Sequence, residues 1–183
     1  MDTHHSNHHQ FWIQAGYPRF SRVRDDSDES LDEALETIFP LWSESAMLAW
    51  HGVYIPLSYK YDISVMCSDI LMMLEKIMTS VSAGMDIAWP SSTFAARWDI
   101  AWKDGEIDIR AEWHSVTGAL EGLLENRTRI LVPKDAFLAE WKAVLANVLR
   151  ALQGAGYDAG QIPDMDRLVR VHGLLPRNGL LYE

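Results

Sequence analysis

The feature that most constrains the fold of this sequence is the Asp104-Gly105 dipeptide, which separates two alternating runs at residues 94–103 and 106–113. Asp-Gly is typical of a type I′ hairpin turn, because both central residues of that turn need a positive φ. A two-residue turn here opposes residues whose numbers sum to 209. One face then carries the apolar pairs Trp102–Ile107, Ile100–Ile109 and Trp98–Ala111, and the other carries the charged pairs Lys103–Glu106, Asp99–Arg110 and Arg97–Glu112. A slip of one residue would destroy both patterns, so the sequence predicts this register.

Helical periodicity predicts four helices elsewhere in the chain. Their expected ranges are Ser30 to Phe39, Ser68 to about Val81, Pro133 to about Gln153, and Asp164 to roughly Val171. Ser30 and Glu33 fit a capping box for the first helix, and Pro40 should end it or open the next helix. Gly84 and Gly154 are expected to close the second and third helices.

β-branched and aromatic residues predict shorter strands around the hairpin. Residues 11–23 are expected to form a short strand or extended segment, residues 52–66 one or two strands with an edge or bend at Pro56, and residues 128–132 a short strand. Residues 41–50 are expected to form a short helix or a loop. Helices and strands do not alternate regularly along the chain. We therefore expect a single α+β domain over residues 11–183, in which an antiparallel sheet that includes the 94–113 hairpin packs against several helices.

Residues 1–10 are expected to form a polar tail with histidines at positions 4, 5, 8 and 9. A His-rich tract can bind a transition metal. A solvated tail is the simpler interpretation, because no cysteine or carboxylate cluster with ligand spacing accompanies the histidines. We assign this tail no function.

The composition narrows the class of protein. Among 183 residues, 16 are Lys or Arg and 26 are Asp or Glu, for a net charge of −10, which argues against binding to nucleic acid. No apolar run approaches the roughly 18 to 20 residues of a membrane span, and the N-terminus lacks the apolar segment of a signal peptide. Cys67 is the single cysteine, so no internal disulfide can form and a reducing cytoplasm is the expected compartment.

The negative charge is concentrated in residues 25–36, where seven carboxylates occupy twelve positions without a Lys or Arg. They are Asp25, Asp26, Asp28, Glu29, Asp32, Glu33 and Glu36. Those from Asp28 onward should share the outward side of the first helix. An ordinary solvated helix face is one explanation, but such faces usually mix charges for i,i+4 support. A surface of a single sign suits the capture of a basic partner, so we predict that these seven residues, with Glu44 behind them, bind a partner.

Tryptophan occurs eight times in the chain. Trp98, Trp102 and Trp141 fall on predicted apolar faces and should belong to the core. The remaining five are not placed by any pattern and are candidates for an exposed anchor, since Trp is enriched at binding hot spots. They are Trp12, Trp42, Trp50, Trp89 and Trp113.

Motifs for catalysis or cofactor binding are absent from the sequence, including GxGxxG, P-loop, GxSxG, HExxH and CxxC patterns. Cys67 precedes an apolar helix and is expected to be a buried structural thiol. Glu112 and His114 share one side of a strand, where an acid/base pair is conceivable, although the hairpin already opposes Glu112 to Arg97. We therefore expect a protein without enzymatic activity, cofactor or metal. The alternative is a small enzyme or ligand-binding domain with a pocket near Glu112 and His114.

Three C-terminal segments carry a family resemblance: WDIAWKDGEIDIRAEWHSV (98–116), PKDAFLAEWKAVLANVLRAL (133–152) and LLYE (180–183). They resemble the immunity proteins of bacterial polymorphic toxin systems, in particular those of contact-dependent growth inhibition. The resemblance covers only the C-terminal half and transfers no binding residue. It implies a cytoplasmic, non-enzymatic protein that binds the C-terminal domain of a cognate toxin and covers its active site. Many such toxins are nucleases with basic grooves, which an acidic inhibitor can occupy.

Overall fold

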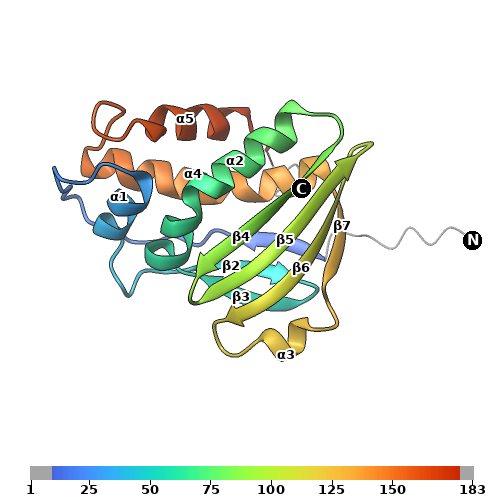
Figure 1. The fold of residues 1–183 in the computed structure, drawn as a ribbon. Helices are drawn as coiled ribbons and strands as arrows, with labels where there is room; N and C mark the ends of the chain where they lie inside the picture. The colour runs from blue at the N-terminus through green and yellow to red at the C-terminus, as the bar shows by residue number, and fades with distance from the viewer. Residues whose placement is uncertain (1–9, 178–183) are drawn as a thin grey trace, which may run out of the picture.

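Two antiparallel sheets and the helices that pack against them make up the computed structural model, which describes residues 10–177 (Figure 1). Sheet A has the strand order β1 (Phe11–Gln14), β2 (Ala46–Trp50) and β3 (Val53–Leu57). Sheet B has the order β4 (Ala83–Ser91), β5 (Phe94–Lys103), β6 (Glu106–Val116) and β7 (Arg129–Pro133). The helices are α1 (Leu31–Ile38), a π-helical turn η2 (Tyr59–Ile63), α2 (Ser64–Thr79), α3 (Glu121–Leu124), α4 (Lys134–Ala155) and α5 (Asp164–Leu174). The predicted α+β class is confirmed.

The β5–β6 hairpin has the predicted register at all six pairs, from Arg97 opposite Glu112 to Lys103 opposite Glu106. Asp104 and Gly105 adopt φ values of 54° and 83°, as a type I′ turn requires. Strand β5 has the predicted range, whereas β6 continues three residues past its predicted end, to Val116, through an irregularity at Ala95/Ala96. The apolar face is buried as expected, but Arg97 forms its ion pair with Asp86 of β4, at 3.4 Å, rather than with Glu112.

Strand β4 was not predicted, and it includes Gly84, the residue that was expected to close the second helix. Helix α2 begins four residues early, at Ser64, and ends at Thr79, so Gly84 lies inside β4 rather than closing the helix. The strand contains Gly84 and Pro90, which both disfavour strands in isolation. Its position at the edge of sheet B tolerates them, because one side of an edge strand needs no hydrogen-bonded partner.

Strand β2 corrects the prediction of a helix or loop over residues 41–50. The run AMLAW shows no alternation, because Leu48, Ala49 and Trp50 are all buried. Pairing with β1 on one side and β3 on the other decides its conformation, since the intrinsic preference for strand is weak and dependent on context.

The ends of the last two helices also differ from the prediction. Gly156, with a φ of 89°, provides the left-handed cap of α4, while Gly154 lies within the helix. A Cβ on Gly154 would come 2.6 Å from Cε2 of Phe20, so close packing explains that glycine. Helix α5 begins at Asp164 itself, after Pro163, and continues to Leu174.

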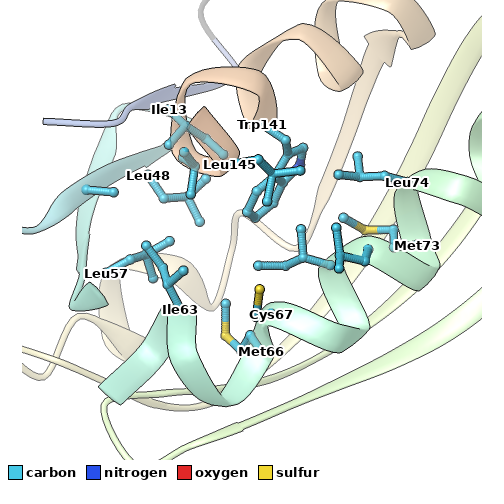
Figure 2. Packing of buried hydrophobic residues seen from close by; sticks show 14 of the residues in the cluster. Ile13, Leu48, Leu57, Ile63, Met66, Cys67, Met73, Leu74, Trp141 and Leu145 are labelled. Atoms are coloured by element: carbon cyan, nitrogen blue, oxygen red, sulfur yellow. The ribbon is translucent and has the colours of Figure 1, made fainter. Parts of the chain in front are cut away.

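The core lies between the inner faces of the sheets and helices α2 and α4. Figure 2 shows Leu48 of sheet A on one side of the Trp141 ring of α4 and Leu74 of α2 on the other, all within one buried cluster. An aromatic cluster joins the sheets, with the Trp98 ring 5.4 Å from that of Trp50 and 5.0 Å from that of Trp89. The predicted core tryptophans Trp98, Trp102 and Trp141 are all buried. None of the helices within residues 10–177 has the length and apolar character that crossing a membrane would require.

Candidate partner-binding surface

Six of the seven predicted carboxylates of residues 25–36 are exposed. Asp25, Asp26 and Glu29 lie in the loop before α1, and Asp32, Glu33 and Glu36 lie on the helix itself. The opposite side of α1 is buried through Leu31, Ala34, Leu35 and Ile38. Apolar spacing therefore orients the helix so that its carboxylates point to solvent.

Asp28 is the exception, and its predicted outward position is wrong. Only 8% of the residue is exposed, and its carboxylate accepts hydrogen bonds from the hydroxyl groups of Tyr157 and Thr37. Burial, followed by the hydrogen bond to Asp28, raises the pKa of Tyr157 to about 12. Asp28 thus anchors the loop to the C-terminal half and is not available to a partner.

The same contacts hold the backbone of the loop. The Asp25 amide donates to the Tyr157 hydroxyl oxygen at 2.9 Å. The Gln161 side chain donates to the carbonyl oxygens of Asp25 (2.7 Å) and Asp28 (3.1 Å). Arg24 donates to the carbonyl oxygen of Gly156 at 2.9 Å. Residues 24–28 are therefore docked on the α4–α5 connection, and both lie beside α1 at one end of the molecule (left in Figure 1).

The α4–α5 connection and the first turn of α5 add exposed carboxylates that were not among the predicted contact residues. Asp158 and Asp164 are exposed, and no Lys or Arg occurs from Ala151 to Asp166. Helices α1 and α5 both pack against α2. Residues 127–183 carry eight basic and six acidic residues, for a net charge of +2. This total conceals the stretch from Ala151 to Asp166, whose lack of Lys and Arg is the sequence signal for these additional carboxylates.

We call these exposed residues the acidic surface. Its members are Asp25, Asp26, Glu29, Asp32, Glu33, Glu36, Asp158 and Asp164.

Hydrogen bonds order part of the acidic surface without neutralising it. The Asp25 carboxylate accepts bonds from the Ser27 hydroxyl and amide, and these lower its pKa. Glu33 accepts from the Glu29 amide at 2.9 Å, whereas the Ser30 hydroxyl makes no capping bond within residues 10–177. The predicted capping box is therefore only half formed and shifted by one residue.

Arg24 and Lys60 lie at the borders of the acidic surface, and Arg167 lies one helical turn after Asp164 on α5, although residues 25–36 contain no cation. Arg24 forms an ion pair with Asp26 at 2.9 Å, but the Asp26 side chain is 85% exposed, so the pair contributes at most about 1 kcal/mol. The Lys60 ammonium donates to the carbonyl oxygen of Glu36 and not to its carboxylate. Most of the carboxylates thus keep their full charge toward solvent.

Glu44 occupies a different position from the other predicted contact residues. It is exposed in the loop between α1 and β2, where its Oε1 would come 3.0 Å from a Cβ on Gly16. The tryptophan nearest to it in the sequence, Trp42, is 91% exposed. Of the other unplaced tryptophans, Trp50 and Trp89 are buried and Trp12 and Trp113 are half-buried.

Glu112 and His114 are both exposed on the outer face of sheet B. Glu112 lines a shallow hollow of about 380 Å³ with Asp86, Arg97, Asp99 and Arg110, and His114 is not part of that lining. The alternative of a small enzyme or ligand-binding domain here stays a hypothesis.

Cys67 is fully buried in α2. Burial, together with smaller contributions from the charges of Asp164 and Asp32, raises the pKa of its thiol to about 12. A thiol held in its neutral form is a poor nucleophile, which agrees with the predicted structural role. No group of three or more potential metal ligands occurs within residues 10–177, and the histidines at positions 4, 5, 8 and 9 lie outside the described residues.

Comparisons with protein-family models, curated proteins and solved structures found no match to this chain.

Proposed function

We propose that this protein is a non-enzymatic immunity protein that binds the basic C-terminal domain of a cognate bacterial toxin, of the nuclease type, and neutralises it in the cytoplasm. The resemblance of the C-terminal segments to immunity proteins supports this proposal. So does the acidic surface, which has the charge expected of an inhibitor that occupies a phosphate-binding groove.

The observation that carries the proposal is how the acidic surface is assembled. Residues 24–28 and the α4–α5 connection are more than a hundred positions apart in the sequence, yet Tyr157 and Gln161 hold them together. Each segment brings carboxylates and few cations, so their proximity creates repulsion that the folded protein has to overcome. A basic partner relieves that repulsion, which favours a surface kept for binding.

The structure also suggests how such an interface would work. Carboxylates on a hydrogen-bonded loop and on a helix are ordered before the partner arrives, so little side-chain and loop entropy is lost on binding. Their common sign would steer a basic groove toward them and raise the association rate at low salt. The toxin active site would then be covered without any chemical step by the inhibitor.

A titration against the product of the neighbouring gene tests the proposal. The probe is the C-terminal domain of the large secreted protein encoded immediately upstream, made catalytically inactive, and the readout is calorimetry over about 0.05 to 0.5 M salt. We expect tight 1:1 binding that weakens steeply with salt. Absence of binding at the lowest salt would overturn the proposal.

Charge reversal tests the surface separately from the function. The variant D25K/D26K/D32K should lose most of the affinity for this domain. The matched control E106K/E112K/E125K makes the same change in net charge at exposed sites outside the acidic surface and should bind almost as wild type does. Equal affinity of the two variants would place the contact elsewhere while leaving the inhibitor role intact.

A further inference from the structure

An exposed apolar patch lies next to the acidic surface. Trp42 is 91% exposed, Tyr17 is 72% exposed and Leu41 is 55% exposed. Trp42 is the only one of the eight tryptophans, all within the described residues, that is classed as exposed. Leaving this much apolar surface in water is unfavourable, and Trp and Tyr are the residues most enriched at binding hot spots. We call Tyr17, Leu41 and Trp42 the Trp42 patch.

Hydrogen bonds hold the two segments of the Trp42 patch together. The Ser43 hydroxyl donates to the Arg19 carbonyl oxygen at 3.0 Å, and the Ser21 amide donates to the Ile38 carbonyl oxygen at 2.7 Å. Within the second segment, the Ser43 amide closes a turn on Pro40. The Arg150 guanidinium lies 4.1 Å from the centroid of the Tyr17 ring. These contacts fix the backbone of both segments, so the exposed side chains of the patch lie on an ordered part of the fold.

The distance between the Trp42 patch and the acidic surface fits a single interface. Helix α1 has eight residues and is thus about 12 Å long, and Trp42 follows its last residue by four positions. A standard interface buries about 800 Å² on each partner, which corresponds to a disc roughly 30 Å across. One partner can therefore cover α1 and Trp42 together.

We propose that the Trp42 patch is the apolar anchor of the toxin interface, and that Trp42 inserts into an apolar pocket beside the basic groove covered by the acidic surface. This inference rests on the proposed function and specifies the partner further: a basic protein domain with an aromatic-accepting pocket at the edge of its groove. The exposed carboxylates of Glu36 and Glu44 flank Trp42 in the sequence, while Arg19 and Arg22 supply cations on the other segment. Such a mixed, charged rim around an apolar centre is typical of binding interfaces.

Although Arg19, Arg22 and Arg150 lie at the Trp42 patch, the eight carboxylates of the adjoining acidic surface select this occupant over two others. A second copy of the chain would bring two acidic surfaces close together, at a net charge of −10 for each molecule. An anionic lipid surface would be repelled by the same carboxylates. A basic protein is attracted by them.

The test uses the same inactive toxin domain, with the full-length protein carrying 5-fluorotryptophan. The W42F variant identifies the ¹⁹F resonance of Trp42 among the eight. Addition of the toxin domain should shift that resonance, and W42A should weaken binding by at least about 30-fold, the range of a hot spot. The control is Y54A, which removes another exposed aromatic ring, on the outer face of sheet A. It should bind as wild type does, and thermal melts should show both variants folded.

The outcomes separate this inference from the proposed function. If wild type binds the toxin domain and W42A binds equally well, the anchor is wrong and the immunity role stands. If wild type does not bind at all, both are overturned. If the Trp42 resonance responds to phosphatidylserine vesicles and not to the toxin domain, the patch is a lipid contact and the inference fails.

Discussion

Sheet B and the acidic surface both expose many charged side chains, but their charges are arranged in opposite ways. On the outer face of sheet B, the hairpin register sets Arg97 opposite Glu112 and Asp99 opposite Arg110, and Asp86 pairs with Arg97. On the acidic surface, eight carboxylates gather with Arg24 as the paired cation at the border. On the sheet, each charge has an opposite charge nearby. At α1, carboxylates of the same sign are kept close to one another by the contacts of the surrounding structure.

Similar exposed charges in the two regions therefore have different physical consequences. Balanced pairs on a strand contribute a little to stability and help to exclude other registers. Carboxylates of one sign reduce stability and instead create a field that reaches a partner. Substitutions in the two regions should therefore change the free energy of unfolding with opposite signs.

The largest expected effect lies beneath sheet B. Replacing Trp98 with alanine removes a fully buried ring that contacts Trp50 and Trp89, and should lower the free energy of unfolding by about 3–5 kcal/mol. Urea denaturation followed by circular dichroism measures this loss. W42A is the matched control, and its change should stay within about 0.5 kcal/mol because the ring is exposed. Similar losses in both variants would contradict the assignment of Trp98 to the core and Trp42 to the surface.

The next effect concerns the hydroxyl group that docks the acidic loop. In Y157F, the Asp28 carboxylate loses a donor and the Asp25 amide loses its acceptor. Because Asp28 is buried, we expect a loss of about 1–3 kcal/mol in the free energy of unfolding and faster hydrogen exchange at residues 25–28. Y54F alters an exposed tyrosine and should change neither quantity. Unchanged exchange in Y157F would mean that the loop is held by other contacts.

A paired carboxylate outside both regions provides a pH-dependent reference. Glu75 accepts hydrogen bonds from Arg167 and Arg170, and the Arg167 bond is the main cause that lowers its pKa. A pKa below the unfolded value means that the stabilisation is complete above about pH 4.5 and is lost as the pH falls through the folded value. E75Q should therefore be less stable than wild type by about 1 kcal/mol at neutral pH, with a difference that shrinks in acid. A difference independent of pH would show that packing, not charge, explains the effect.

The smallest effect contrasts the two charged regions directly. E36Q removes repulsion from Asp32 and Glu33, which lie one turn earlier on α1, and should raise the free energy of unfolding by a few tenths of a kcal/mol at low salt. R97A breaks the pair with Asp86 and should lower it by less than about 1 kcal/mol. Thermal melts at low and high salt measure both changes, which should shrink as salt screens the charges. Stabilisation by R97A, or destabilisation by E36Q, would contradict the contrast between the two charged regions.

The sequence alone determined those features that depend only on residues close together in the chain. The register of the hairpin follows from Asp104-Gly105 and the alternation beside it, and the exposed side of α1 follows from its apolar spacing. The clustering of carboxylates in residues 25–36 is likewise visible in the sequence, because it needs no knowledge of distant contacts. Of the five carboxylates expected to face outward, Glu29, Asp32, Glu33 and Glu36 are exposed and Asp28 is buried.

The tertiary structure decided what depends on distant partners. Strands β2 and β4 exist because neighbouring strands complete their hydrogen bonds, which local propensity does not reveal. Tyr157 buries Asp28 and brings Asp158 to the same end of the molecule as Asp25, across more than 125 positions of sequence. The exposure of Trp42 was equally undetermined, since composition places tryptophan in either a core or an interface. The burial of a side chain and its distance from other charges depend on how the chain packs, so they are known only from the three-dimensional structure.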